Sequence, residues 1–134
     1  MADVTTTQVV SVSTATKGRV INSARHNHWV IDSPSGPAEA VSTGESFLAG
    51  LSACAVTLVQ AVAAADGVTL GPLAVDVASF RVPEKPYDYD RIEVAFRYDG
   101  LPLAEAERLT GCGRNVDRST GRSRSRPPPP SPPP

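Results

Sequence analysis

Two cysteines are the residues of this chain whose side chains could carry out nucleophilic or redox chemistry. Cys54 lies in an apolar stretch, and Cys112 follows 58 residues later between two glycines. The thiolate is the reactive form of a cysteine, and a neighbouring cation or a helix N-terminus stabilises it. Cysteine is also one of the residue types most often buried as an inert core side chain. Composition alone favours the inert role for Cys54, so its reactivity depends on what surrounds it.

Arg19 and Arg25 are the two arginines upstream of Cys54 that could stabilise its thiolate. His26 and His28 follow Arg25, and two histidines in this spacing could be metal ligands. The chain has no other histidine, which would leave such a metal site short of ligands. We therefore expect a polar strand face there, with no metal and no cofactor.

A long helix is predicted over about residues 43–65. Ser42 and Glu45 fit a capping box at its start, and Gly67 is suited to end it. Much of the rest is alanine and glycine, so the helix is thin and apolar on more than one side. One small sheet cannot cover such a helix, and we expect a dimer. Apolar side chains recur along it at three- and four-residue intervals, at Phe47, Leu48, Leu51, Ala55, Leu58, Val59 and Val62.

Helix geometry separates Glu45 from Cys54. The two residues are nine positions apart, which at about 100° and about 1.5 Å per residue puts them on opposite faces and roughly 13 Å apart. Cys54 is also too far from the helix N-terminus to be helped much by the helix dipole. Glu45 can therefore share a site with Cys54 only if the helix breaks near its start or if the two come from different subunits. As the third residue of the capping box, Glu45 also has a purely local explanation.

The remaining pattern indicates one α+β domain over residues 1–110. Residues 4–32 are rich in Thr and Val and predict two or three antiparallel strands, the last over about 26–32. Turns are expected at Lys17-Gly18 and Asn22-Ser23, and a Gly/Pro-rich break follows over 33–37. Residues 73–82 and 91–98 predict two more strands. Residues 103–110 open a second helix that no clear signal ends.

Residues 111–134 differ from the rest of the chain. They hold five arginines, one aspartate and a run of prolines, which predict a disordered Arg/Ser/Pro-rich tail. The prolines could dock on an aromatic groove and the arginines could touch nucleic acid, but a solvated tail is the simpler interpretation, and we expect no nucleic-acid partner. The N-terminus lacks the features of a signal peptide, and no apolar run is long enough to cross a membrane. We expect a cytoplasmic protein with no membrane partner.

The stretch from Arg25 to Cys54 resembles the OsmC/Ohr family of thiol peroxidases (osmotically inducible protein C and organic hydroperoxide resistance protein). A strand ending in Asp32-Ser33-Pro34 and a Gly/Pro loop precede Gly44-Glu45-Ser46-Phe47-Leu48-Ala49-Gly50-Leu51-Ser52-Ala53-Cys54. This order is similar to the family pattern of D-x-P followed by E-x-x-L-x-A-x-x-A-C at the start of a long central helix. The following strand pair also matches, so the resemblance covers about residues 1–110.

The resemblance implies an α+β fold in which an antiparallel sheet wraps a long central helix within an intertwined homodimer. It implies that Cys54 reduces organic or fatty-acid hydroperoxides through a sulfenic acid. A second cysteine would then form a disulfide with Cys54, and a dithiol reductant would reopen it. It also implies that an arginine stabilises the thiolate and a glutamate orients that arginine. Glu45 fits this glutamate by motif, while Arg25 is the preferred arginine and Arg19 the alternative.

The end of the chain departs from the family pattern. The family's second cysteine is followed by proline and then by a last strand, and Cys112 has neither. Cys112 is nevertheless the candidate resolving cysteine. A reading-frame change beyond about Leu109 would explain the departure and could leave an inactive chain. The other alternative to a peroxidase is a non-enzymatic dimer of the same fold that binds a lipid-like molecule.

Overall fold

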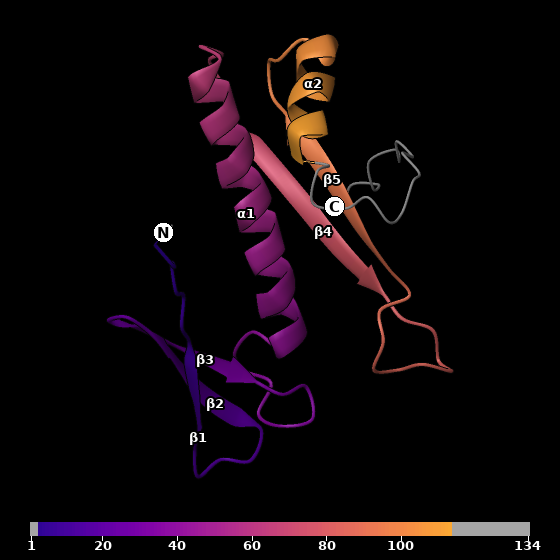
Figure 1. Ribbon diagram of the computed structural model, residues 1–134. Coiled ribbons are helices and arrows are strands. Elements are labelled where there is room, and N and C mark those ends of the chain that lie inside the picture. The colour runs from indigo at the N-terminus through magenta and orange to yellow at the C-terminus, as the bar shows by residue number, and fades with distance from the viewer. Residues whose placement is uncertain (1–2, 114–134) are drawn as a thin grey trace, which may run out of the picture.

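The structure is a computed structural model that describes residues 3–113, the last two by their backbone alone (Figure 1). Most of the predicted tail, residues 114–134, lies outside the described residues. The elements follow one another as β1 (Val10–Ser13), β2 (Arg19–Ala24), β3 (Asn27–Asp32), α1 (Thr43–Ala65), β4 (Leu73–Phe80), β5 (Arg91–Tyr98) and α2 (Leu103–Gly113). This order confirms the α+β class.

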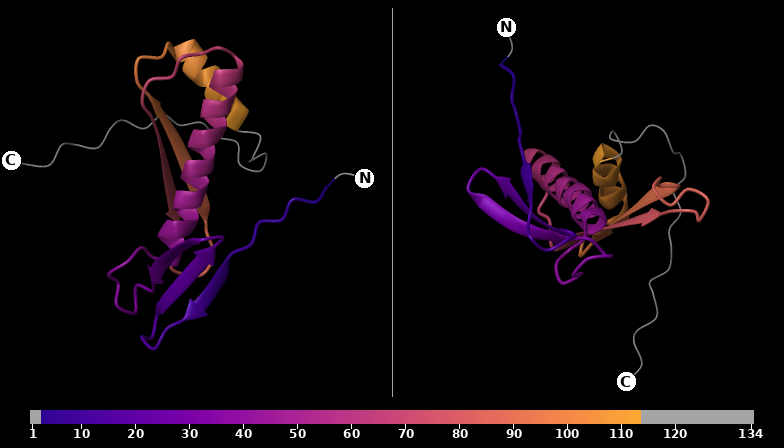
Figure 2. Two further views of the ribbon diagram at one scale, coloured as in Figure 1. Left: turned by 90° about the vertical axis from the view of Figure 1, so that its left-hand side faces the viewer. Right: turned by 90° about the horizontal axis from the view of Figure 1, so that it is seen from below.

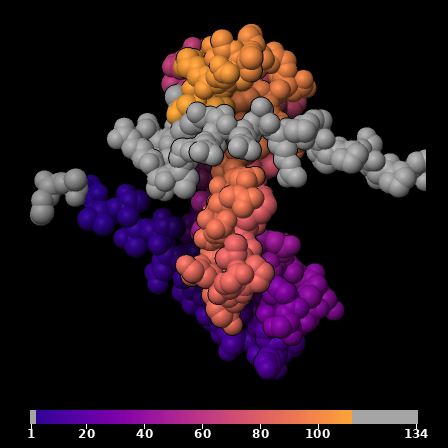
Figure 3. Space-filling model, turned by 90° about the vertical axis from the view of Figure 1, so that its right-hand side faces the viewer, coloured from indigo at the N-terminus to yellow at the C-terminus, as the bar shows by residue number. Residues whose placement is uncertain are grey.

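The described strands form two antiparallel sheets. The first sheet has the order β1-β2-β3, and the second is the hairpin β4-β5. The helix α1 runs between them, with the first sheet at its N-terminal end and α2 beside its C-terminal end (Figures 1 and 2). The first sheet and α2 consequently gather at opposite ends of the molecule (Figure 3).

The bounds of α1 follow from local hydrogen bonding at both ends. At the start, Ser42 Oγ accepts from the backbone N–H of Glu45, and Glu45 accepts from the backbone N–H of Ser42, which confirms the capping box. At the end, Gly67 takes a positive φ of 68°. The N–H groups of Gly67 and Val68 then donate to Ala64 and Ala63, as in a Schellman motif. The predicted helix over 43–65 is therefore confirmed.

The buried core lies against the second half of α1. Val59 and Ala63 of α1 and Leu109 of α2 are fully buried. An ion pair from Arg108 to Asp66, 2.6 Å long, closes the same end of the helix pair. Partly buried side chains from α1, β4, β5 and the adjoining loops surround these three residues, namely Val62, Val68, Leu70, Leu73, Phe96, Tyr98 and Leu101.

Three local expectations are wrong. The turn predicted at Asn22-Ser23 lies instead at Arg25-His26, because Asn22 is buried in β2 and its amide donates to the Trp29 carbonyl across the sheet. The strand predicted over 73–82 ends at Phe80. The second helix, predicted over 103–110, continues to Gly113, so residues 111–113 belong to α2 and not to the predicted tail.

The side of α1 that carries Phe47 and Leu58 is more exposed than it would be in a central helix buried within one chain. Phe47 is 49% exposed and Leu58 is 36% exposed, although both belong to the predicted apolar stripe. By length and composition, α1 could cross a membrane. Its most apolar 18-residue stretch has a mean hydropathy of 1.9, and only 11% of that stretch is buried. This contrasts with our expectation that no segment is apolar enough, but α1 packs against β4 and α2 as a central helix does.

Replacing Leu109 by alanine should lower the free energy of unfolding by about 3 kcal/mol, because it leaves a cavity in the middle of the small core. Urea unfolding at a fixed protein concentration measures the change. Leu103→Ala in the same helix is the matched control, since Leu103 is 75% exposed, and its effect should stay within about 0.5 kcal/mol. Equal losses in the two variants would contradict this position for the core.

Candidate functional site

Cys54 lies near the middle of α1, and its side chain is exposed. The inert, buried role that composition favours is therefore not what this single chain shows. Neighbours three and four positions away along the helix are Gly50, Leu51, Thr57 and Leu58. Thr57 turns its hydroxyl back to the carbonyl oxygens of Ala53 and Cys54, at 3.1 Å each. The thiol thus lies on a small, mainly apolar stretch of helix surface.

Glu45 lies in the first turn of the same helix, and its carboxylate accepts from the Ser42 N–H at 2.7 Å. The helix is continuous from Thr43 to Ala65, so it does not break between Glu45 and Cys54. Of the two arrangements that would bring these residues to one site, only the pairing of different subunits is compatible with this helix.

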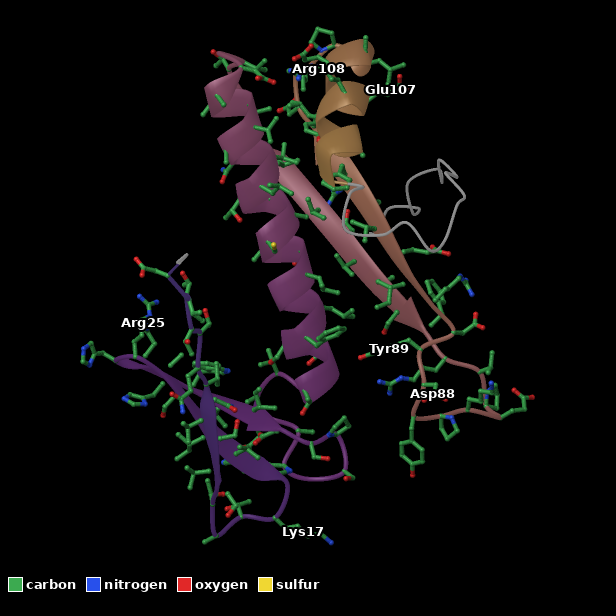
Figure 4. The ribbon with its side chains drawn as sticks, viewed as in Figure 1. Lys17, Arg25, Asp88, Tyr89, Glu107 and Arg108 are labelled. Carbon is green, nitrogen blue, oxygen red and sulfur yellow. The ribbon has the colours of Figure 1, made fainter. Side chains whose placement is uncertain are left out.

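Arg25 lies at the tip of the β2–β3 hairpin, on the side away from α1 (Figure 4). Because Ala24 pairs with Asn27, Arg25 is the first residue of a two-residue turn. Its φ of 56° is typical of that position in a tight hairpin turn. Among residues 3–113, no hydrogen bond or ion pair joins Arg25, Glu45 and Cys54. Cys112 lies in the last turn of α2, and its side chain lies outside the described part of the structure.

Arg19 forms a charged cluster with two carboxylates, Asp32 and Glu39. It lies directly opposite Asp32 in the β2–β3 pairing. Its Nε and Nη2 atoms each donate to an oxygen of the Asp32 carboxylate at 2.8 Å. Nη2 also donates to Glu39 at 2.7 Å. Two carboxylates therefore engage this arginine, which leaves it less available to a thiolate than a cation without partners would be.

Asp32 is 1% exposed and serves as the acceptor at the centre of this cluster. Besides Arg19, the backbone N–H groups of Glu39 and Ala40 donate to its Oδ2 atom at 3.1 Å each. The hydrogen bonds from Arg19 lower the pKa of the Asp32 carboxyl well below its usual range, against an opposing effect of burial. The same contacts raise the pKa of the Arg19 guanidinium above its ordinary value. Arg19 and Asp32 are therefore both ionised throughout the physiological range.

Sequence reasoning missed two features of this region. The D-x-P pattern identifies Asp32 but not its partner Arg19, because that pairing follows from the strand register, which the predicted turn at Asn22-Ser23 does not give. The sequence places Arg81 at a predicted strand end and Tyr89 in the loop that follows, and gives no sign that the Arg81 guanidinium lies 4.6 Å from the centre of the Tyr89 ring. No group of three or more His, Cys, Asp and Glu side chains within residues 3–113 could hold a metal ion.

Asp32→Asn should destabilise the protein at neutral pH and do so progressively less as the pH falls. The folded-state pKa of Asp32 is depressed, so its contribution is present above the unfolded value of about 3.9 and disappears as the pH falls through the folded value. Urea unfolding of both proteins between pH 7 and the acid limit of folding measures this difference. A difference in the free energy of unfolding that does not depend on pH would contradict the ionic role of Asp32. Asp76→Asn, which removes the carboxylate of an exposed pair with Arg97, is the control.

The sequence matches no protein-family model and no curated protein, whereas the fold matches solved structures across most of the chain. An OsmC-like protein from Mycoplasma pneumoniae superposes with a TM-score of 0.73 at 15% identity, covering 83% of this chain and 82% of that one. The organic hydroperoxide resistance protein OsmC of Legionella pneumophila gives a TM-score of 0.62 at 22% identity, covering 86% of each chain. The organic hydroperoxide resistance protein OhrB of Bacillus subtilis gives 0.60 at 16% identity, covering 84% of this chain and 85% of that one. The chain therefore has the OsmC-like fold.

Proposed function

We propose that this chain is a cytoplasmic thiol peroxidase of the OsmC/Ohr type that reduces organic or fatty-acid hydroperoxides at Cys54. The observation that carries the proposal is the exposed thiol of Cys54 on the central helix of an OsmC-like fold. A thiol must be accessible to react with a peroxide. The short apolar surface beside it suits the organic part of such a substrate better than it suits hydrogen peroxide.

The chemistry balances with a peroxide and a dithiol. The Cys54 thiolate attacks one peroxide oxygen, so that an S–O bond forms while the O–O bond breaks and the leaving alkoxide takes up a proton to become an alcohol. The sulfur is thereby oxidised to a sulfenic acid. A thiol then attacks this sulfur, releases water and forms a disulfide. A dithiol reductant completes the cycle by exchange, leaving Cys54 reduced and the reductant as a disulfide. Cys112 is the candidate for the intervening thiol.

An exposed apolar face of the first sheet supports the association of two copies of this chain. One face of the first sheet carries apolar side chains that are all well exposed, at 49% for Val10, 58% for Val12, 45% for Ile21 and 38% for Val30. A contiguous apolar surface of this kind usually lies against another protein surface. We propose a homodimer in which Glu45 of one subunit approaches Cys54 of the other and orients the arginine that stabilises the thiolate.

The choice of that arginine follows from the environments of the candidates. Arg19 is bound by Asp32 and Glu39, whereas Arg25 projects from the outer tip of a hairpin and forms no ion pair with any described residue. A hairpin tip can reach across to a second subunit. Arg25 is therefore the better candidate within the dimer, and Arg19 is the alternative if its carboxylate contacts rearrange on assembly.

Cys54→Ser should abolish the consumption of an organic hydroperoxide such as cumene hydroperoxide with a dithiol as reductant, because serine cannot form the sulfenic acid. Following peroxide loss over time measures this. Cys112→Ser is tested alongside. Loss of turnover there, with sulfenic acid still formed at Cys54, makes Cys112 the resolving thiol, and unchanged turnover assigns resolution to the external dithiol. Peroxide consumption by Cys54→Ser at the wild-type rate would overturn Cys54 as the reacting thiol. A wild-type rate no faster than that of the dithiol without protein would favour a non-enzymatic role.

Glu45→Gln should reduce peroxidase turnover roughly tenfold to a hundredfold, because the amide orients the activating arginine poorly. Its thermal stability should change little, since glutamine can replace glutamate in a capping box. Ser42→Ala is the matched control, because it weakens the cap by about 1 kcal/mol and leaves the carboxylate in place. Equal losses of activity in both variants would mean that Glu45 acts only through the helix start.

Mixing the inactive Cys54→Ser protein with the impaired Glu45→Gln protein tests whether the site is shared between subunits. After unfolding and joint refolding of Cys54→Ser with Glu45→Gln, a shared site returns about one quarter of the wild-type activity, because half of the dimers are mixed and each holds one intact site. A site confined to one chain returns no more activity than the Glu45→Gln protein contributes by itself.

A further inference from the structure

A recess of about 480 Å³ lies where α1 begins, between the loop that precedes α1 and the loop that joins β4 to β5. Six of the residues that line it are Pro34, Thr43, Gly44, Phe47, Arg81 and Tyr89. Its size falls within the range of small-molecule sites. Cys54 is not among the lining residues, so on a single chain this recess is separate from the proposed peroxidatic cysteine.

The walls of the recess are held in place by stacked side chains from distant parts of the sequence. The rings of Phe47 and Tyr89 are stacked, with centroids 5.8 Å apart and planes inclined by 10°. Arg81 lies over the Tyr89 ring at 4.6 Å, a distance at which a cation and an aromatic face attract each other. Tyr89 lies on the β4–β5 loop close to the first turns of α1 (Figure 4). The aromatic surface and the guanidinium are thus brought together before any ligand arrives.

The charge of the recess is positive. Among residues 3–113, Arg81 is the only charged residue that lines it, and Arg81 forms no ion pair with an acidic residue of that range. Arg19, Arg91, Arg97 and Arg108 each have carboxylate partners. Asp88 and Asp90, the acidic residues on either side of Tyr89, line a neighbouring recess together with Lys85 and Tyr89 itself. Glu45, in the adjoining helix turn, is engaged by the Ser42 N–H.

We propose that this recess binds a small organic acid, with its carboxylate on Arg81 and its aryl or short alkyl body against Phe47 and Tyr89. A guanidinium presents two parallel N–H donors that match a carboxylate. The aromatic pair supplies an apolar wall, which a bare inorganic anion would not use. The ligand class is therefore an anion with an apolar body. This site goes beyond the proposed peroxidase activity and does not depend on it.

Titration of the full-length protein with benzoate, monitored by ligand-detected NMR at low salt, tests the proposal. Benzamide serves as the neutral probe of the same shape, and inorganic phosphate as the anion without an apolar body. Benzoate should bind more tightly than both. Equal binding of benzamide would remove the role of charge, equal binding of phosphate would remove the role of the aromatic wall, and either result would overturn the proposal. Absence of benzoate binding would do the same.

Variants assign the binding to the recess. Arg81→Gln should weaken benzoate binding about tenfold or more, because it removes the charged donors. Arg97→Gln, an exposed strand arginine in a pair with Asp76, is the matched control and should bind as the wild type does. Tyr89→Phe should retain binding and Tyr89→Ala should lose it, with circular dichroism establishing that each variant is folded. Undiminished binding by both Arg81→Gln and Tyr89→Ala would place the ligand elsewhere.

Cys54→Ser separates this inference from the proposed activity. It should bind benzoate with the wild-type affinity, because Cys54 does not line the recess. If the wild type binds benzoate but shows no peroxidase turnover, the proposed function is wrong and the acid site is retained. Loss of benzoate binding in Cys54→Ser would contradict a site separate from the thiol.

Discussion

The paired hydrogen bonds between Arg19 and Asp32 fix the geometry from which the long helix departs. They cross from β2 to β3, and the same carboxylate receives the backbone of Glu39 and Ala40 in the loop that leads to α1. A buried carboxylate with four donors is strongly stabilised in its charged form. Because the loop is tied to the end of β3, the direction in which α1 begins depends on a single side chain.

The long helix then sets the distances between all candidate site residues. Its capped start presents Glu45 and the recess beside Arg81, while its middle presents Cys54. A rigid helix keeps these groups apart within one subunit. A shared site requires a second helix to lie alongside, and the alanine and glycine residues of α1 keep its surface thin enough for such an approach. The same rigidity that separates the residues in one chain would hold them in register across a pair of chains.

The helix α1 was predictable because its signals are local. The apolar repeat, the Ser42–Glu45 box and Gly67 each act within a few residues, and together they give the observed bounds. The β2–β3 turn was not predictable, because Arg25 adopts a positive φ that is expected of glycine or asparagine. Asn22, which resembles a turn residue, instead donates a hydrogen bond across the sheet. The partner of Arg19 and the stacking of Arg81 on Tyr89 depend on which strands and loops meet, and no spacing along the chain encodes that. The candidate roles of Cys54, Glu45, Arg25 and Cys112 came from resemblance and stay proposals.

The position of the buried core has a consequence for local opening of the molecule. Val59, Ala63 and Leu109 protect the second half of α1, whereas the first sheet is held mainly by its own ladder and by the Asp32 contacts. In an isolated chain, backbone amides near Val59 would exchange with solvent only through global unfolding, while those of β1 would exchange through small local openings. In the proposed dimer, association would remove this contrast, so the amide exchange of β1 would report directly on the fraction of chains that are dimeric.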